Sequence, residues 1–328
     1  MIPGSGRPVP IPLTPRVIDG IEAVVRLRAR VAQDPALKNV RFDELLKSAQ
    51  GRIVMTGRIG DQPVIIKQIL TDDAHQAVTA ISSELQRIAP RYTNGPLRLA
   101  ELRASWPQYG LYAKVRVPGD PMVRLLSLVT PDRRRSMLSR AGAWFARYSD
   151  NDRAPAPLIL GQQLMLLKDA RLDNLPAALR GPVDALRQRL LARADRIAGV
   201  RATYGRTHGD FVPGNLIVHK GDIWGIDIGV DPRMPLALEI ARFVNWAALA
   251  VPDGEGGDNA PDAGDDHTAL GADALLQATG DPAAMRFFDG FALFRLANEM
   301  APAPSLHARL AQRIARHLSG QRSVISRP

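Results

Sequence analysis

The segment THGDFVPGNLIVHKGDIWGID, residues 207–227, is the most informative part of the sequence. Its second half contains two short, apolar and β-prone runs, 216–218 and 223–226, separated by turn-forming residues around Gly221. Apolar runs joined by such a short polar turn predict a β-hairpin. A loop that contains Gly and Pro residues leads into this hairpin.

Three polar side chains lie at the open end of the predicted hairpin. Asn215 precedes the hairpin and Asp227 follows it, each six residues from Gly221. Because the two strands of a hairpin run antiparallel, we expect these two side chains to lie side by side. Asp210 comes five residues before Asn215, in a loop stiffened by Pro213. Two carboxylates and one amide oxygen are therefore expected to converge on one spot.

This combination of side chains favours phosphoryl transfer. Magnesium binds a few hard oxygen ligands and keeps water and phosphate oxygens for its other positions, so Asn215 and Asp227 are candidate Mg²⁺ ligands. Asp210 is the candidate catalytic residue, because its carboxylate can accept a hydrogen bond from an attacking hydroxyl and orient it. The alternative interpretation is a polar hairpin rim with capped turns and no catalytic role.

The motif HGDxxxxN, followed by a short hairpin and Ile226-Asp227, resembles the aminoglycoside phosphotransferase-like branch of the protein-kinase-like superfamily. That branch includes antibiotic kinases, choline-type kinases and uncharacterised bacterial small-molecule kinases. The similarity covers about residues 40–320 and is most specific at 207–227. The resemblance implies an ATP- and Mg²⁺-dependent enzyme that phosphorylates a hydroxyl of a small molecule.

The resemblance also implies a role for each residue of the motif. Asp210 matches the catalytic Asp of the family, and Asn215 and Asp227 match its metal-binding pair. His208 matches a position that supports the loop, and a general-base role is the competing interpretation. Glu239 stands where the family usually has Asp, and we expect it to pair with an Arg or to cap the catalytic loop.

Upstream of this region, short β-prone segments alternate with turn residues. They predict strands at 42–47, 53–58, 63–70, 97–103 and 109–117, with a helix at 73–89 after the third strand. Five strands and one helix form a small α+β lobe. The resulting domain prediction is an N-terminal arm and helix at 1–40, a nucleotide-binding lobe at 41–118, and a helical lobe with the catalytic loop and the acceptor site at 119–328.

Two charged residues of the small lobe are candidates for nucleotide binding. Lys67 ends the β-prone run Val64-Ile65-Ile66, as the phosphate-binding Lys of a kinase strand does. Glu84, in the helix that follows, is the expected ion-pair partner that would hold Lys67 over the α- and β-phosphates. The alternatives are a solvated Lys at the end of a strand and an exposed Glu on a helix.

The second half of the chain is predominantly helical. After a candidate hinge at 118–121, periodic apolar positions predict helices at 130–149, 158–167, 182–197, 236–250, 269–278, 282–300 and 305–318. The stretch 252–266 contains six acidic residues, no Lys or Arg, and several Gly and Pro, which predicts a mobile surface loop. The predicted fold class is α+β, protein-kinase-like and bilobal, with a small antiparallel-sheet N-lobe and a larger, mainly helical C-lobe.

Composition narrows the class of protein further. The absence of Cys excludes disulfides and thiolate zinc sites. No run of 18 apolar residues predicts a membrane span, so a cytoplasmic protein is expected. The net charge of +10 attracts anions, and surface association with a membrane stays open. Aromatic residues make up only 5% and no nucleic-acid motif is present, so no nucleic-acid partner is expected. The oligomeric state is left open.

The acceptor is not determined by these patterns. The acidic stretch 252–266 favours a cationic acceptor such as an amino sugar or amino alcohol. The basic remainder of the chain favours an anionic acceptor, such as a sugar of a cell-envelope precursor. Two further hypotheses remain beside an active kinase: a nucleotide-binding pseudokinase that acts as a regulatory module, and a basic protein that uses the kinase-like fold as a scaffold for nucleic acid or membrane.

Overall fold

The computed structural model describes residues 22, 24–29, 33–49, 51–149, 152–229, 233–251 and 263–320. The chain forms two compact units. The N-terminal unit runs to Ala89 and resumes over Ala100–Val117. The C-terminal unit takes Pro90–Leu99 and continues from Pro118. Residues 24–29 are helical, whereas the arm predicted at the start of the chain lies outside the described residues.

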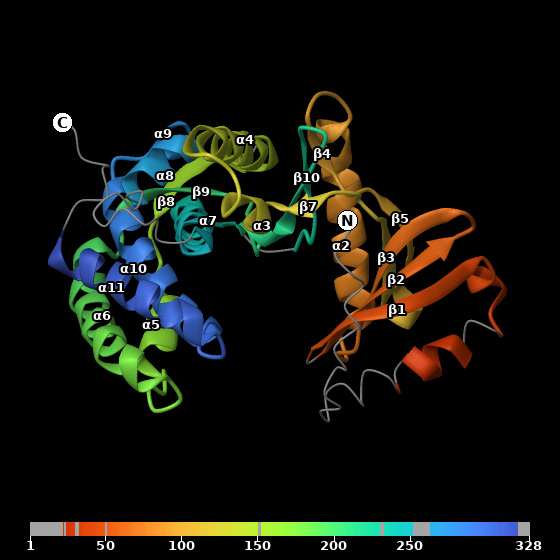
Figure 1. The fold of residues 1–328 in the computed structure, drawn as a ribbon, viewed down its shortest axis with the longest axis horizontal. Helices are drawn as coiled ribbons and strands as arrows, with labels where there is room; N and C mark the ends of the chain where they lie inside the picture. Colours follow the sequence, from red (N-terminus) through yellow and green to blue (C-terminus); the bar gives the residue numbers. More distant parts are fainter. Residues whose placement is uncertain are drawn as a thin grey trace, which may run out of the picture. The chain divides into compact units, whose positions relative to one another are not determined.

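The N-terminal unit is built on one antiparallel sheet (Figure 1). Its strand order is β1-β2-β3-β6-β5, with β1 at Val40–Ala49, β2 at Arg52–Ile59, β3 at Gln62–Ile69, β6 at Leu111–Val115 and β5 at Leu102–Trp106. Alternate residues of neighbouring strands, such as Ile53 on β2 and Ile66 on β3, are fully buried in its core. The predicted small antiparallel sheet is therefore confirmed, except that its fourth strand in chain order is β5 and not a strand at 97–103.

One helix, α2 (Ala74–Ile88), follows the third strand as predicted. Its buried positions include Val78, Leu85 and Ile88, which fall on one face at helical spacing and face the core. In the chain, α2 lies after β3 and before β5 and β6. It therefore belongs to the connection between β3 and β6, which are neighbours in the sheet.

The single strand predicted at 97–103 is wrong. The structure has two strands there, β4 (Leu97–Leu99) in the C-terminal unit and β5 in the N-terminal unit. β4 pairs in parallel with β11 (Asp222–Gly225). An apolar β-prone run shows that a segment is extended but not which strand it pairs with, so the pattern alone does not reveal this break.

Residues 207–227 form a loop and a hairpin in the C-terminal unit. β10 (Leu216–His219) pairs antiparallel with β11, with Leu216 opposite Gly225, which confirms the predicted hairpin. The two turn residues, Lys220 and Gly221, have φ of 47° and 87°. Two consecutive positive φ values are the signature of a tight two-residue hairpin turn. The hairpin joins β4 and β7 (Asp120–Pro121) in the order β4-β11-β10-β7.

Helices make up most of the C-terminal unit (Figure 1). They are α3 at Met122–Leu126, α4 at Pro131–Ser149, α5 at Gly161–Lys168, α6 at Ala177–Ile197, α7 at Leu236–Ala250, α8 at Ala263–Leu270, α9 at Ala272–Leu275, α10 at Asp281–Glu299 and α11 at His307–Ser319. A small sheet in the order β12-β9-β8 accompanies them, with β12 at Met234–Pro235, β9 at Arg201–Gly205 and β8 at Ala154–Pro157. α10 packs on α7 and on α6, and Phe287, Phe288 and Phe291 fill the core between them.

Three helix predictions differ from the structure in their bounds. The helix expected at 158–167 begins at Gly161, after the strand β8. The helix expected at 182–197 begins at Ala177, because Pro182 lies inside it rather than at its start. The helix expected at 269–278 is replaced by α8 and α9, which are separated by Gly271 at a positive φ of 73°.

The predicted mobile acidic loop at 252–266 is wrong at its C-terminal end. Residues 252–262 lie outside the described residues, and α8 begins at Ala263. Asp266 is only 3% exposed, and its Oδ2 lies 2.5 Å from Nη2 of Arg134 on α4. A buried carboxylate needs such a partner, and composition could not supply that information. No helix that the structure describes is long and apolar enough to cross a bilayer.

Candidate active site

The loop between β9 and β10 is held by the fully buried side chain of His208. The His208 Nδ1 accepts from the Asp210 backbone N–H (3.4 Å), so the proton resides on Nε2, which donates to the carbonyl oxygen of Ile226 (2.9 Å). The backbone N–H of His208 donates to Glu239 Oε2 at 3.0 Å. His208 therefore ties the loop to the end of the hairpin, as the supporting role predicts, and Glu239 caps the loop.

Aromatic rings of α4 and α7 pack against His208 and Phe211 of the same loop. The ring of Phe211 stacks between those of Phe145 and Phe243, with centroid distances of 4.5 and 4.4 Å. Trp144 on α4 contacts the ring of His208 edge-on at 5.7 Å. A Cβ added at Gly225 would overlap the Trp144 ring, so the hairpin also packs directly on this helix. Closely packed rings leave the loop one arrangement.

Both oxygens of the Asp210 carboxylate have defined neighbours. The Asn215 Nδ2 donates to the backbone carbonyl oxygen of Asp210 (2.8 Å) and to its Oδ2 (3.0 Å). On the other side, Nη2 of Arg242 lies 2.8 Å from Asp210 Oδ1. The side chain of Asp210 is nevertheless 46% exposed. The structure thus brings together Asp210 and Asn215, as predicted, and adds an Arg that sequence reasoning missed.

Asn215 also leaves an atom suited to a cation. Its NH₂ group makes the two bonds to Asp210, so its amide oxygen takes no part in them and is the atom that a hard cation would bind. Among the residues that the structure describes, no three or more His, Cys, Asp or Glu side chains gather as a metal site.

Asp227 follows the hairpin at a positive φ of 59°. The backbone on both sides of it is tied to the loop, because Ile226 N–H donates to Asn215 O (2.9 Å) and Gly229 N–H donates to His208 O (3.0 Å). A non-glycine residue with positive φ is uncommon and clusters at functional sites. Asp227 therefore has a left-handed backbone conformation and follows Ile226, whose N–H is bonded to Asn215. Its role as a metal ligand stays a prediction.

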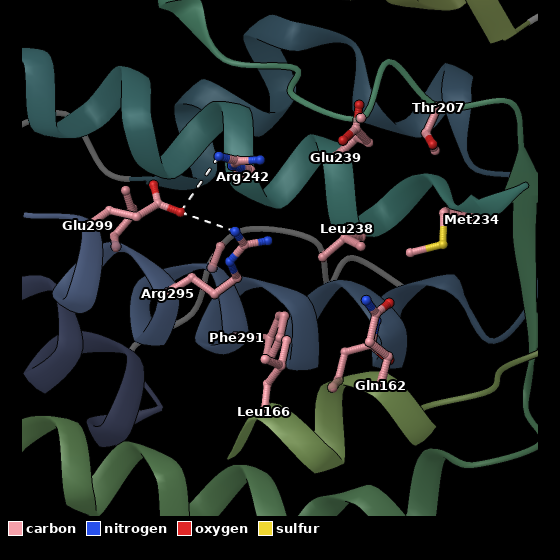
Figure 2. A pocket seen from close by; sticks show the side chains of 14 residues that line it. Gln162, Leu166, Thr207, Met234, Leu238, Glu239, Arg242, Phe291, Arg295 and Glu299 are labelled. Atoms are coloured by element: carbon pink, nitrogen blue, oxygen red, sulfur yellow. Dashed lines mark hydrogen bonds and ion pairs between the residues drawn. The ribbon is translucent and has the colours of Figure 1, made fainter. Parts of the chain in front are cut away.

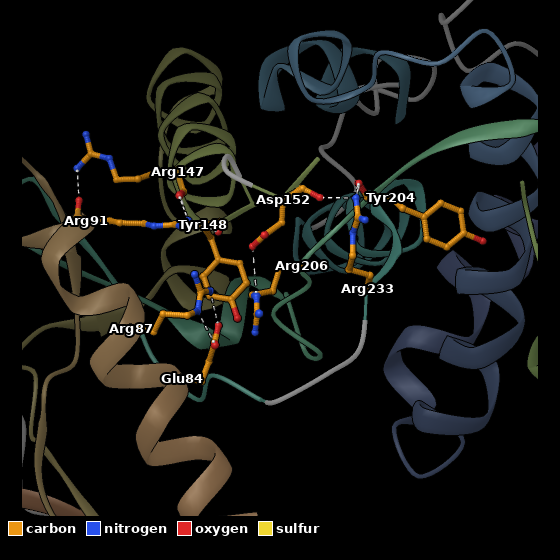
Figure 3. Close-up of polar contacts among 9 residues, drawn as sticks. All are labelled: Glu84, Arg87, Arg91, Arg147, Tyr148, Asp152, Tyr204, Arg206 and Arg233. Atoms are coloured by element: carbon orange, nitrogen blue, oxygen red, sulfur yellow. Dashed lines mark hydrogen bonds and ion pairs between the residues drawn. The ribbon is translucent and has the colours of Figure 1, made fainter. Parts of the chain in front are cut away.

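Polar contacts outside the loop anchor the segment that leads into it (Figure 3). The carboxylate of Asp152 accepts from Nε of Arg206 at 3.4 Å, and its backbone carbonyl oxygen accepts from Nη2 of Arg233 at 2.5 Å. Arg206 directly precedes Thr207, the first residue of the motif. These contacts position the chain as it leaves β9.

The two candidates of the N-terminal unit are both buried. Lys67 lies on β3 between Val54 and Tyr112 of the neighbouring strands and is 5% exposed. Glu84 lies on α2, is 4% exposed, and accepts from Arg87 Nε and Nη2 at 2.9 Å each (Figure 3). Charged side chains are seldom buried unless they are paired. The two alternatives, a solvated Lys at the end of a strand and an exposed Glu on a helix, are therefore excluded. The pairing of Lys67 with Glu84 stays a prediction.

A cavity of about 220 Å³ opens next to the loop within the C-terminal unit (Figure 2). Its lining comes from α5, the loop, β12, α7 and α10: Gln162, Gln163, Leu166, Thr207, Gly209, Met234, Leu238, Glu239, Arg242, Phe291, Ala292, Arg295, Leu296 and Glu299. Gly209, which directly precedes Asp210, and Arg242, which pairs with Asp210, both line the cavity, so the cavity lies next to the candidate catalytic residue. Sequence reasoning missed Arg295 and Glu299, since no local motif marks them.

The sheet unit with one helix after its third strand, and the helical unit with a buried His loop before a hairpin, define a protein-kinase-like α+β fold. It is the fold of solved structures of small-molecule kinases of the aminoglycoside phosphotransferase type. No protein-family model matches the sequence, and no curated protein matches it.

Three solved structures illustrate the likeness. The amicoumacin kinase hAmiN, in complex with AMP-PNP, Ca²⁺ and Ami, is 14% identical, with a TM-score of 0.52 over 92% of this chain and 95% of that one. The GDP complex of aminoglycoside 2′-phosphotransferase-IIIa is 10% identical, with a TM-score of 0.55 over 92% and 99%. A choline/ethanolamine kinase family protein from Mesorhizobium loti is 15% identical, with a TM-score of 0.53 over 90% and 98%. At these identities the likeness establishes the fold.

Proposed function

We propose that this protein is an ATP-dependent phosphotransferase that moves the γ-phosphoryl group of ATP to a hydroxyl of a small molecule. The observation that carries the proposal is the geometry of Asp210, whose carboxylate accepts from Asn215 and pairs with Arg242, a residue that lines a cavity of about 220 Å³. Solved structures with the same fold include complexes with AMP-PNP and with GDP, which supports the use of a nucleotide here.

In the proposed reaction Asp210 accepts the hydrogen bond of the acceptor hydroxyl and takes its proton. The bond from the hydroxyl oxygen to the γ-phosphorus forms as the bond from that phosphorus to ADP breaks. The amide oxygen of Asn215 and the carboxylate of Asp227 would hold Mg²⁺, which neutralises the phosphate charge. Lys67, supported by Glu84, would contact the nucleotide phosphates. The candidate acceptors are an amino sugar, an amino alcohol, a sugar and an anionic sugar of a cell-envelope precursor, and we place the reaction in the cytoplasm, where ATP is available.

The test is ADP release with a panel of hydroxyl-bearing metabolites. We expect Asp210→Asn to reduce kcat by about 10²–10⁴-fold, the usual contribution of a positioned acid or base, while nucleotide binding persists. Asp195→Asn, an exposed Asp on α6, is the matched control and should leave turnover unchanged. Wild-type turnover by Asp210→Asn would refute the assigned role of Asp210.

One observation favours a second candidate, a nucleotide-binding module without turnover. The ion pair between Arg242 and Asp210 occupies the carboxylate that the reaction needs. This alternative predicts that ATP with Mg²⁺ stabilises the protein while no acceptor of the panel causes release of ADP.

A further inference from the structure

The cavity beside Gly209 has an unusual set of charges at one end. Arg242 on α7 and Arg295 on α10 both reach the carboxylate of Glu299, and Figure 2 shows the three side chains joined across the two helices. The Glu299 Oε1 lies 3.6 Å from Nη2 of Arg242 and 3.3 Å from Nη2 of Arg295. Two guanidinium groups therefore share one carboxylate at the mouth of the cavity.

The other carboxylates near the cavity have separate roles. Glu239 lines the cavity but is buried and accepts the backbone N–H of His208, so its charge is directed to the loop. Asp210 pairs with Arg242 and is the candidate catalytic group. Arg242 thus divides its charge between Asp210 and Glu299. Two Arg residues line the described cavity. Arg242 contacts the carboxylates of Asp210 and Glu299, whereas Arg295 contacts that of Glu299, and the side chain of Arg295 is 44% exposed.

The rest of the cavity suits a small carbon skeleton. Leu166, Leu238 and Phe291 provide apolar surface between the loop and the guanidinium groups (Figure 2). Its volume of about 220 Å³ is below the usual range for drug-sized ligands, so a single small molecule fits better than a chain of rings. Asp266, the acid of the stretch 252–266 whose side chain the structure describes, is buried against Arg134 and does not line the cavity.

We propose that the acceptor carries an anionic group, a carboxylate or a phosphate, which Arg295 binds together with Arg242. This inference rests on the proposed phosphotransferase function and names the class of its substrate. The planar guanidinium group binds carboxylate and phosphate oxygens with two parallel hydrogen bonds. The ion pairs run from Asp210 through Arg242 and Glu299 to Arg295, so an acceptor anchored at Arg295 can extend its hydroxyl along them toward Asp210. A cationic acceptor seated at Arg295 would meet a like charge there, because the neighbouring carboxylate of Glu299 is already shared by the two guanidinium groups.

The test uses acceptors that differ in charge: glucose, glucosamine, glucuronate and glucose 6-phosphate, extended by hydroxy acids, amino alcohols and sugar phosphates. ADP release gives kcat and KM for each. We expect kcat/KM to be at least about tenfold higher for an anionic acceptor than for its neutral or cationic counterpart, the effect of one charged hydrogen bond. Glucuronate and glucose 6-phosphate distinguish a carboxylate from a phosphate acceptor.

Arg295→Ala separates recognition from chemistry. It should raise KM for the anionic acceptor at least about tenfold with little change in kcat, and leave KM for a neutral acceptor unchanged. Arg295→Lys should restore part of the loss, because it keeps the charge but not the planar fork. Arg286→Ala, which removes an exposed Arg of the same helix outside the cavity, is the matched control and should behave as wild type.

The outcomes distinguish this inference from the function on which it rests. Phosphorylation of neutral or cationic acceptors alone overturns the anionic acceptor and leaves the phosphotransferase intact. Failure of every anionic acceptor, with ATP and Mg²⁺ still raising the melting temperature, also overturns it. Absence of any stabilisation by ATP and Mg²⁺ refutes the proposed function itself.

Discussion

Asp210 and its neighbours show how single residues prepare the site. The Asn215 amide contacts two atoms of Asp210, and the Arg242 guanidinium and the His208 ring contact one atom each. The backbone N–H of His208 in turn donates to Glu239. A carboxylate with fixed neighbours needs little reorganisation when a hydroxyl arrives. The side chain of Glu239 is long enough to reach the loop from α7, where its Oε2 accepts from the backbone N–H of His208 at 3.0 Å.

Glu239 provides the prediction at this scale. Glu239→Ala should lower the free energy of unfolding by about 1–3 kcal/mol, because the buried backbone N–H of His208 loses its acceptor. Glu239→Gln keeps an acceptor oxygen and should cost less. Urea unfolding of the two variants and the wild type measures the difference. Equal stability of all three proteins would show that the loop is held without this bond.

At the scale of elements, α4 and α8 approach each other closely enough to exclude any side chain. A Cβ added at Gly142 on α4 would overlap the carbonyl oxygen of Leu270 on α8. The same two helices are joined by the buried pair of Arg134 and Asp266. Burial raises the pKa of Asp266 by more than the attraction of Arg134 lowers it. Helix α8 therefore packs by shape and by charge on the helix that supports the candidate loop.

Gly142 provides the prediction for this contact. Gly142→Ala should lower the free energy of unfolding by about 1–3 kcal/mol, because α4 and α8 must move apart. The matched control is Gly181→Ala on α6, where a Cβ meets no atom within 4 Å. That change should leave stability unchanged or raise it by up to about 1 kcal/mol, since Ala is the better helix former. Calorimetry on both variants tests the contact, and destabilisation of both to the same extent would contradict it.

At the scale of the whole molecule, the chain has a net charge of +10 and two compact units. A basic protein attracts nucleotides but also any other polyanion, so charge alone does not identify a ligand. Nucleotide binding that depends on a divalent cation is more specific evidence than binding that depends on net charge. It separates a nucleotide site from a basic scaffold, whose polyanion binding would be sensitive to salt and independent of Mg²⁺.

Nucleotide binding provides the prediction for the whole chain. ATP with Mg²⁺ at a hundred times its Kd should stabilise the folded protein by about 2.7 kcal/mol through mass action. EDTA should remove the part that depends on Mg²⁺, and Asp227→Ala should do the same. Thermal melting with and without each addition is the measurement. A Mg²⁺-dependent shift that survives intact in Asp227→Ala would exclude Asp227 as a metal ligand.

Local sequence patterns were enough to predict the hairpin, the helix after the third strand, and the loop that carries Asp210 and Asn215. These features depend on neighbours within about ten residues, where apolar periodicity and turn residues act directly on the backbone. The tight turn at Gly221 is a local feature of this kind, and the structure agrees with it.

Tertiary structure alone decided the partners. β4 and β5 are adjacent in sequence yet belong to different sheets. Asp266, at the end of the acidic stretch 252–266, forms a buried ion pair with Arg134 on α4. Arg242 and Arg295 come together although 53 residues separate them, because α7 and α10 pack against each other. Such contacts depend on which faces of distant helices pack together, and no periodicity within one segment encodes the face of another.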